Sequence, residues 1–302
     1  MNAASFTFLA LGLAIVAGAA GLHLRVAGKK WPAWPAGLLA CLAFGLAAGL
    51  VQPMGVWWVM LLCLAGWWHG RSQGLLSGGC FGALALAMAL HVLPGFRHLP
   101  LMVNVVLAPG ALPFNLSAHV DKGLAGLCLW MLMGRTAGCD RRAHAGPCDA
   151  ALVGQVLAWA LGTATIVMGL AWAVGLVHVA PRWLTVPDAW ALVWRFMLVN
   201  LFLTCVAEEA FFRGLVQGGL ARWMSARPAW KRHAVWGAVA VAAVLFGLAH
   251  VGGGWLFAAL ATLAGLGYGL ACARTGRLGA AVTVHFTVNA VHFLFFTYPR
   301  LA

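Results

Sequence analysis

The chain alternates between long apolar runs and short polar breaks. A helix that crosses the ~30 Å hydrocarbon layer of a bilayer needs about 20 apolar residues, and ten runs are long enough to form a complete or partial span. They cover residues 4–22, 36–51, 55–69, 75–93, 123–134, 151–178, 189–220, 235–251, 255–273 and 279–297. This pattern predicts an all-α fold, a polytopic transmembrane helical bundle of about 8–10 spans.

Two stretches depart from a simple succession of spans. Residues 94–122 contain four prolines, which remove backbone donors and clash within a helix, so we expect an outside loop or a re-entrant segment there. The run at 189–220 is too long for one upright span, because a helix of that length reaches about 48 Å at 1.5 Å per residue. We expect it to tilt, to break or to extend into water.

Composition makes lipid the solvent for most of the chain. Hydrophobic residues make up 63% of it and charged residues only 8%, against roughly 25% charged residues in soluble domains. A chain of this kind cannot cover a water-facing surface with polar groups. We therefore expect an integral, multi-pass membrane protein with the bilayer as its first partner, and the composition resembles that of proteins from a bacterial cytoplasmic membrane.

The strongly basic charge indicates topology rather than nucleic-acid binding. Nineteen Lys and Arg stand against six Asp and Glu, for a net charge of +13. The basic residues follow the first, third, fifth, seventh and ninth apolar runs, as at 25–30 and 222–232. Cytoplasmic loops carry such an excess, so the pattern predicts both termini outside and no nucleic-acid partner.

Eight cysteines occur without a C-x-x-C pair. Six lie in apolar runs and are interpreted as small buried hydrophobic residues. Cys139 and Cys148 instead flank His144 in a basic loop. Two thiolates and one imidazole fall short of the four ligands of a structural zinc site, so a plain loop is the favoured interpretation.

The only two glutamates are neighbours, Glu208 and Glu209, inside the long run at 189–220. Ionisable groups at membrane depth are costly and are candidates for function. Glu209 and Arg213 are four residues apart on one helical face, which gives Glu209 a counter-ion. Glu208 points about 100° away from Glu209 around the helix and is expected to lack that partner. An unpaired carboxylate in apolar surroundings is what a general base near neutral pH requires. A buried ion-pair network between helices is the competing interpretation.

Histidines and one asparagine supply further polar groups downstream. His250 ends an apolar run that contains Phe246, while His285 and Asn289 lie four residues apart and therefore on one helical face. The remaining candidates in or near spans are interpreted as hydrogen-bonding ties between helices. These are His23, His91, His178 and His292.

Three motifs then occur in order on successive hydrophobic spans. They are Glu-Glu-x-x-x-Arg at 208–213, Phe-x-x-x-His at 246–250 and His-x-x-x-Asn at 285–289. Together they resemble the CAAX protease and bacteriocin-processing family of intramembrane proteases, also called the Abi family, which includes the Ras-converting type of endopeptidase. The resemblance covers about 189–297, and residues 1–188 match it far less firmly. We accordingly divide the chain into an N-terminal transmembrane region, 1–188, and a protease core, 189–302, that holds the catalytic polar cluster.

The resemblance implies a glutamate-dependent hydrolase that cleaves a membrane-associated protein or peptide. Glu208 and His250 would activate a water, and His285 and Asn289 would stabilise the oxyanion. Glu209, Arg213 and Phe246 would be supporting residues. No cofactor is implied and a metal-free site is favoured, although Glu208, His250 and His285 together could ligate zinc and leave one position for water.

Two other functional classes remain open. A non-catalytic binding or immunity protein could keep the same fold, although its lack of turnover would remove the need for all four polar residues. A proton-coupled transporter could use either glutamate, but it predicts two related halves with broken helices, and the sequence shows no such repeat.

Overall fold

The computed structural model describes residues 2–26, 28–133, 149–181 and 189–301. The chain forms two compact units, and each is described by itself. The first unit comprises Met1–Leu99, Ala118–Gly134 and Phe202–Phe211, and the second comprises Pro100–Ser117, Arg135–Leu201 and Phe212–Ala302. The division at residue 188 rests on motifs and stays a prediction about the extent of the protease core.

Each of the ten apolar runs forms a helix or a continuous set of helical segments. In the first half these are α1 (Ala3–Ala19), α2 (Trp34–Ala47), α3 (Pro53–Ser72), α4 (Leu75–Ala89) and α5 (Val120–Met133). They are followed by α6 (Ala150–Ala173), α7 (Ala189–Val199), α8 (Val206–Glu209), α9 (Gly218–Ser225), α10 (Ala234–Leu248), α11 (Trp255–Thr275) and α12 (Leu278–Phe295). Helices satisfy their own backbone groups, as apolar surroundings require.

Five helical segments of the described chain are long and apolar enough to cross a membrane. They are Ala150–Ala173, Ala189–Ser225, Lys231–Leu248, Trp255–Thr275 and Leu278–Phe295, while α1, α2 and α4 are shorter apolar helices. Outward-facing apolar side chains such as Leu39, Leu75 and Trp255 are 67%, 77% and 75% exposed. Lipid tails, rather than water, suit such surfaces, and the prediction of a polytopic helical membrane protein is confirmed.

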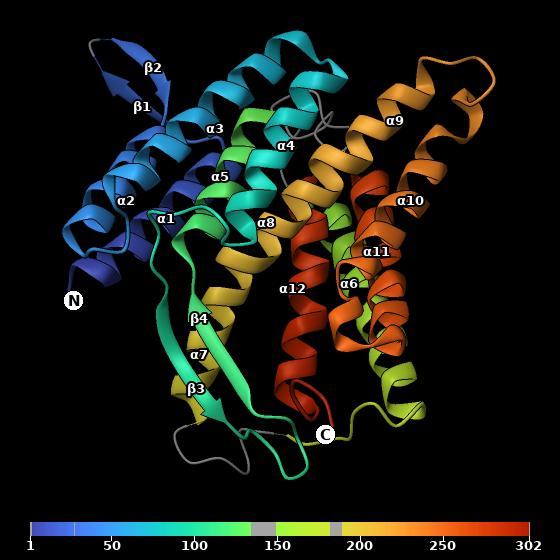
Figure 1. The fold of residues 1–302 in the computed structure, drawn as a ribbon. Helices are drawn as coiled ribbons and strands as arrows, with labels where there is room; N and C mark the ends of the chain where they lie inside the picture. The colour runs from blue at the N-terminus through green and yellow to red at the C-terminus, as the bar shows by residue number, and fades with distance from the viewer. Residues whose placement is uncertain (1, 27, 134–148, 182–188, 302) are drawn as a thin grey trace. The chain divides into compact units, whose positions relative to one another are not determined.

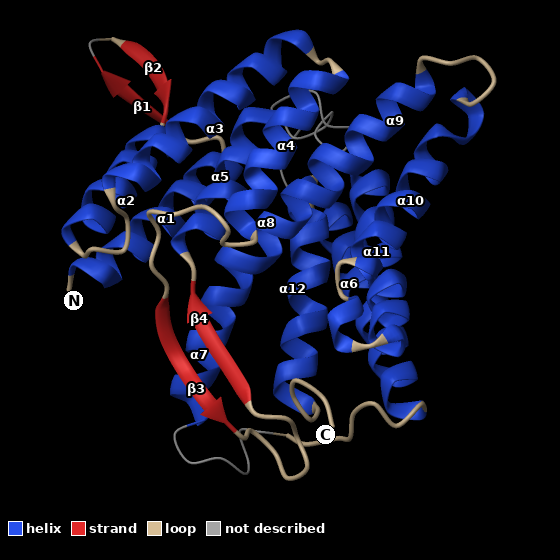
Figure 2. Cartoon of the chain, viewed as in Figure 1, coloured by secondary structure: helices blue, strands red, loops and turns tan. Residues whose placement is uncertain are grey.

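In the first unit, α5 is the central helix. It packs against α1, α3, α4 and α8, and α1 packs against α2. A short hairpin of β1 (His23–Val26) and β2 (Lys29–Pro32) joins α1 to α2, with Arg25 opposite Lys30. The sequence predicted only a basic loop there, so this hairpin (Figure 2) was not anticipated.

The proline-rich stretch also forms strands, β3 (Leu99–Val105) and β4 (Phe114–Ala118), which pair in a second two-stranded sheet. The expectation of a non-helical segment is confirmed, whereas the hairpin itself was not predicted. Within the second unit, Phe114 contacts the ring of Tyr298 at 4.9 Å, and Phe196 stacks on Phe293 at 3.8 Å. Aromatic packing therefore anchors this hairpin.

In the second unit, α11 is the central helix. It packs against α6, α10 and α12, and α6 also packs against α12 (Figure 1). Gly247 of α10 permits the close approach of α11, because a Cβ at this position would collide with Thr262 Oγ1 and lie 2.6 Å from the Ala258 carbonyl oxygen. Small residues serve this purpose at helix contacts in membranes.

The long helix over Ala189–Ser225 does not break. It changes its winding twice, through the π-helical segments η3 (Asn200–Cys205) and η4 (Ala210–Gln217), which flank α8. π-helical turns are rare and occur frequently at functional sites. The segment that carries both glutamates is therefore unusual in backbone as well as in charge.

The cysteines only partly follow the expectation. Cys41, Cys128 and Cys205 are buried, as predicted, but Cys80 is exposed. Cys272 is buried and disulfide-bonded, so it is not simply a small hydrophobic residue. Cys139, His144 and Cys148 lie outside the described residues.

Candidate active site

The four predicted catalytic residues divide between the two units. Glu208 lies on α8 in the first unit, whereas His250, His285 and Asn289 lie in the second unit. Their joint action remains a prediction. Each environment is therefore described separately.

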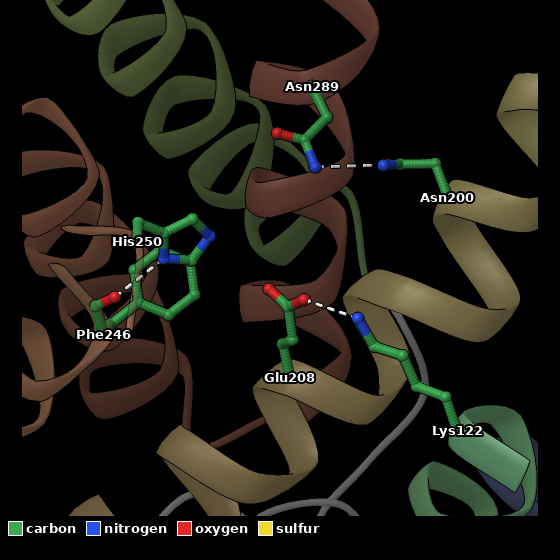
Figure 3. A network of polar contacts seen from close by, with 6 residues as sticks. All are labelled: Lys122, Asn200, Glu208, Phe246, His250 and Asn289. Atoms are coloured by element: carbon green, nitrogen blue, oxygen red, sulfur yellow. Dashed lines mark hydrogen bonds and ion pairs between the residues drawn. The ribbon is translucent and has the colours of Figure 1, made fainter. Parts of the chain in front are cut away.

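Glu208 has a charged partner, contrary to the sequence-based expectation. Lys122 Nζ, from the first turn of α5, lies 2.8 Å from Glu208 Oε1 (Figure 3). The two side chains are 20% and 19% exposed. The prediction was wrong because it considered partners only within one helix, whereas Lys122 is 86 residues away in the sequence. The ammonium offsets the cost of holding a carboxylate away from water.

A glycine on α5 permits this contact. A Cβ at Gly126 would lie 2.8 Å from Ala207 Cα and 2.9 Å from Ala207 N. Gly126 and Lys122 are four residues apart and therefore share a helical face. The missing side chain lets α5 lie directly against α8, next to Glu208.

The second unit contains a cavity of about 90 Å³. Its walls are mostly apolar and come from α6, α11, α12 and the end of α10. Four polar residues also line it: His250, Tyr268, Asn289 and His292. Two of these are predicted site residues, and mostly apolar walls with a few convergent polar groups are typical of binding sites.

His250 lies in the turn between α10 and α11. Its Nδ1 is 2.8 Å from the carbonyl oxygen of Phe246 (Figure 3). Because a carbonyl oxygen can only accept, Nδ1 donates the hydrogen and Nε2 is the basic nitrogen of the neutral ring. The turn is completed by Gly254, whose φ of +98° suits glycine. The backbone thus fixes the tautomer of His250.

Asn289 is held by a residue of the long helix. Its Nδ2 donates to Asn200 Oδ1 at 3.3 Å (Figure 3), and Asn200 is the first residue of η3. A carboxamide nitrogen carries two hydrogens. Asn200 therefore fixes the orientation of a donor group at the cavity.

His285 lies behind the cavity wall. The residue is 3% exposed, and its ring stacks on Tyr268 at 4.5 Å with an interplanar angle of 12°. Phe246 contacts it edge-on at 5.6 Å. The residues that line the cavity do not include His285, so its role as an oxyanion donor remains a prediction.

The supporting residues are buried. Glu209 and Arg213 are both 0% exposed. The Arg213 guanidinium carbon lies 5.4 Å from the ring centre of Phe246 and 5.9 Å from that of Tyr268, within the range of cation–π attraction. Arg213 therefore supports the two rings that contact His285, while its ion pair with Glu209 remains a prediction.

Sequence reasoning missed four polar residues of the candidate site. Lys122, Asn200 and Tyr268 were not assigned, and His292 was interpreted only as a tie between helices. The Nε2 of His292 donates to the carbonyl oxygen of Thr297, just after the end of the same helix, at 3.2 Å, and His292 also lines the cavity. Polar residues within apolar runs are the signal that could have found Asn200, Tyr268 and His292, whereas Lys122 lies just before the run at 123–134. Tyr268 is also one of only two tyrosines in the chain.

A second polar cluster lies in the first unit, at His91, His119 and Asp121. His91 Nδ1 is 2.8 Å from Asp121 Oδ2, and the rings of His91 and His119 stack at 3.7 Å. Burial, followed by the neighbouring His91, lowers the pKa of His119 to about 4. His119 is consequently neutral at physiological pH.

Comparison with known families gives a match in the C-terminal part of the chain. Residues 188–291 match the family model described as type II CAAX prenyl endopeptidase Rce1-like. This segment is similar to that family. The match covers about a third of the chain and contains all three motifs, which confirms the resemblance noted from the sequence. No curated protein and no solved structure matches the chain.

The Rce1-like match supports a membrane endopeptidase in general. It implies a bilayer setting and a protein substrate. His250, His285 and Asn289 all lie within the matched residues, as does Glu208. Lys122 lies outside them, in a part of the chain that the family model does not cover.

Proposed function

We propose that this protein is an intramembrane endopeptidase that uses Glu208 and His250 to activate water and Asn289 with His285 to stabilise the oxyanion. The observation that carries the proposal is that His250 and Asn289, from two different motifs of the matched residues, line the same cavity in the second unit. Neither residue is close to the other in sequence. A bacterial cytoplasmic membrane is the proposed location.

The first step is attack of water on a peptide carbonyl carbon. Glu208 takes one proton from the water as the new C–O bond forms, with the water held by the basic Nε2 of His250. Lys122 fixes one carboxylate oxygen of Glu208 at 2.8 Å, which orients the base. The carboxylic acid then returns the proton to the leaving amine as the C–N bond breaks.

The second requirement is a donor for the developing oxyanion. Asn289 supplies a carboxamide N–H whose direction is set by Asn200. Preorganised donors of this kind stabilise a transition state by about 2.7–4 kcal/mol. His285 is the second proposed donor, and its ring is held by the stack on Tyr268.

The cavity walls point to an apolar substrate segment. Val167, Met168 and Leu260 form part of its lining. An apolar side chain next to the scissile bond would fill this space and exclude water. The proposed substrate is accordingly the tail or membrane-adjacent segment of a membrane-anchored protein or peptide.

A cleavage assay tests this function. The full chain, reconstituted in lipid nanodiscs, is incubated with quenched membrane-anchored peptides, and wild type is compared with Glu208→Gln and His250→Ala. Asp149→Asn is the matched control, because Asp149 is an exposed acidic residue that caps α6 and an asparagine keeps the cap. Parallel reactions contain a zinc chelator.

We expect wild type and Asp149→Asn to cleave, and both site variants to lose cleavage by about 10²–10⁴-fold, as for loss of a general acid–base. Retained cleavage in Glu208→Gln would contradict the assignment. Loss with chelator alone would move Glu208, His250 and His285 into a zinc site. A wild type that binds peptides without cleaving any would favour the binding-protein alternative.

A further inference from the structure

The cluster of His91, His119 and Asp121 has no role in the proposed reaction. It joins His91, the second residue after α4, to the start of α5, and all three residues belong to the first unit. One potential ligand atom from each lies within 4.8 Å of the others. The cluster also lies outside residues 188–291, so the Rce1-like match does not account for it.

The chemistry of the cluster suits a transition metal. Two imidazoles and one carboxylate are the donor set of many zinc sites with an open position, and imidazole nitrogens favour zinc over magnesium or calcium. Zinc–nitrogen bonds of about 2.0–2.1 Å place neighbouring tetrahedral ligands about 3.3 Å apart. The observed separations of up to 4.8 Å therefore require only modest side-chain rotation.

The cluster can supply that rotation and a fourth ligand. The side chain of His91 is 35% exposed, whereas that of Asp121 is 5% exposed and forms the fixed side of the site. A third imidazole, His98, stacks on His119 with ring centres 5.2 Å apart and is exposed. The stack places this imidazole beside the cluster.

The backbone of His91 ends α4 in an unusual conformation. His91 has a φ of +60°, a left-handed conformation that glycine or asparagine usually occupies after a helix. Histidine is strained in this position, and strained residues cluster at ligand and switch sites. The conformation directs the imidazole to Asp121, where Nδ1 donates at 2.8 Å.

We propose that His91, His119 and Asp121 form a Zn²⁺-binding site in the first unit, with His98 as the fourth ligand. The metal replaces the hydrogen between His91 Nδ1 and Asp121 Oδ2, and His91 then carries its proton on Nε2. The bound metal thereby links the segment after α4 to the start of α5. This inference does not depend on the proposed proteolytic function.

Metal binding by the intact protein provides the test. The full chain in detergent is stripped with chelator, incubated with limiting Zn²⁺ and desalted, and retained zinc is measured by mass spectrometry. Co²⁺ serves as a spectroscopic probe, because its absorption reports tetrahedral nitrogen and oxygen ligation. Thermal unfolding with and without Zn²⁺ gives a second readout, since a ligand that binds the folded state raises its stability.

The variants separate this site from other sources of zinc binding. His119→Ala and Asp121→Asn remove ligands, and His98→Ala removes the fourth one. His23→Ala is the matched control, because His23 is an exposed histidine of β1 in the same unit. Cys139→Ser with Cys148→Ser tests the basic loop as an alternative site. His91→Gly removes a ligand, and glycine readily adopts the left-handed conformation of this position.

We expect one zinc per chain in wild type, in His23→Ala and in the double cysteine variant. His119→Ala and Asp121→Asn should retain less than a tenth of that amount, and His98→Ala should bind at least tenfold more weakly. His91→Gly should lose the metal and the zinc-dependent rise in melting temperature while remaining folded. The proposal is overturned if wild type retains no stoichiometric zinc, or if His119→Ala and Asp121→Asn retain it. A chelator effect on cleavage that persists in His119→Ala belongs to the active site and not to this cluster.

Discussion

The two units hold their polar residues in different ways. In the first unit, Glu208 is held by a charged partner, Lys122, on a neighbouring helix. In the second, His250 and Asn289 are held by uncharged hydrogen bonds, to a backbone carbonyl and to Asn200. Aromatic rings add to this second environment, with His285 stacked on Tyr268.

The difference follows from the cost of polar groups in apolar surroundings. A carboxylate away from water needs a counter-charge, and helices must approach closely to supply it. A neutral imidazole or carboxamide needs only a hydrogen bond. The first environment therefore depends on helix spacing at Gly126, and the second on local turns and ring packing.

After the losses expected for Glu208→Gln and His250→Ala, the next largest effect is expected in the second unit. Asn289→Ala should lower kcat by about 10²–10³-fold, because it removes an oxyanion donor. Thr283→Ala, an exposed position on the same helix whose hydroxyl donates to the carbonyl oxygen of Gly279, should keep wild-type activity. Cleavage rates on one peptide measure both. Equal rates in wild type and Asn289→Ala would remove this residue from the proposed mechanism.

Adding a side chain at a close helix contact should lower the stability by a similar amount in both units. Gly126→Ala and Gly247→Ala each place a Cβ against neighbouring atoms, and overpacking costs roughly 1–3 kcal/mol. Gly162→Ala, where a Cβ meets nothing within 4 Å, should be neutral or stabilising by up to about 1 kcal/mol through helix propensity. Thermal unfolding in detergent compares the three, and equal melting temperatures would contradict the packing account.

A smaller effect is expected for the residue that orients Asn289. Asn200→Ala should lower kcat by about tenfold, which corresponds to about 1.4 kcal/mol and to one hydrogen bond. Because Asn200 acts through Asn289, the double variant with Asn289→Ala should be no slower than Asn289→Ala alone. An additional tenfold loss in the double variant would show that Asn200 acts elsewhere.

The smallest expected effect is the pairing energy of Lys122 with Glu208. Both side chains are partly exposed, so we expect a coupling of about 1 kcal/mol between Lys122→Met and Glu208→Gln in a double-mutant cycle. Unfolding free energies of the four proteins measure it. Strict additivity of the two single changes would mean that the contact contributes nothing to stability.

The helices could be predicted from the sequence, and the hairpins could not. A segment in lipid must be apolar over its whole length and must satisfy its own backbone, so every helix left a clear pattern. The prolines at 94–122 excluded a helix but did not indicate β3 and β4. The two π-helical segments around α8 left no pattern that helical periodicity detects.

The candidate site was predictable only where its chemistry is local. The motifs placed His250 and Asn289, which line one cavity. Lys122 and Asn200 lie 86 and 89 residues from their partners, and no spacing rule reaches that far. Glu208 was consequently expected to have no partner, although its charge made one necessary.

The central claim is that Glu208 of the first unit and His250 of the second act in the same chemical step. The most direct test is a comparison of cleavage rates for Glu208→Gln, His250→Ala and the double variant in nanodiscs. Residues that act as one catalytic group are strongly non-additive. The account predicts that the double variant is no slower than the slower single variant. A double variant whose loss equals the product of the two single losses would show that the residues act independently and would contradict the account.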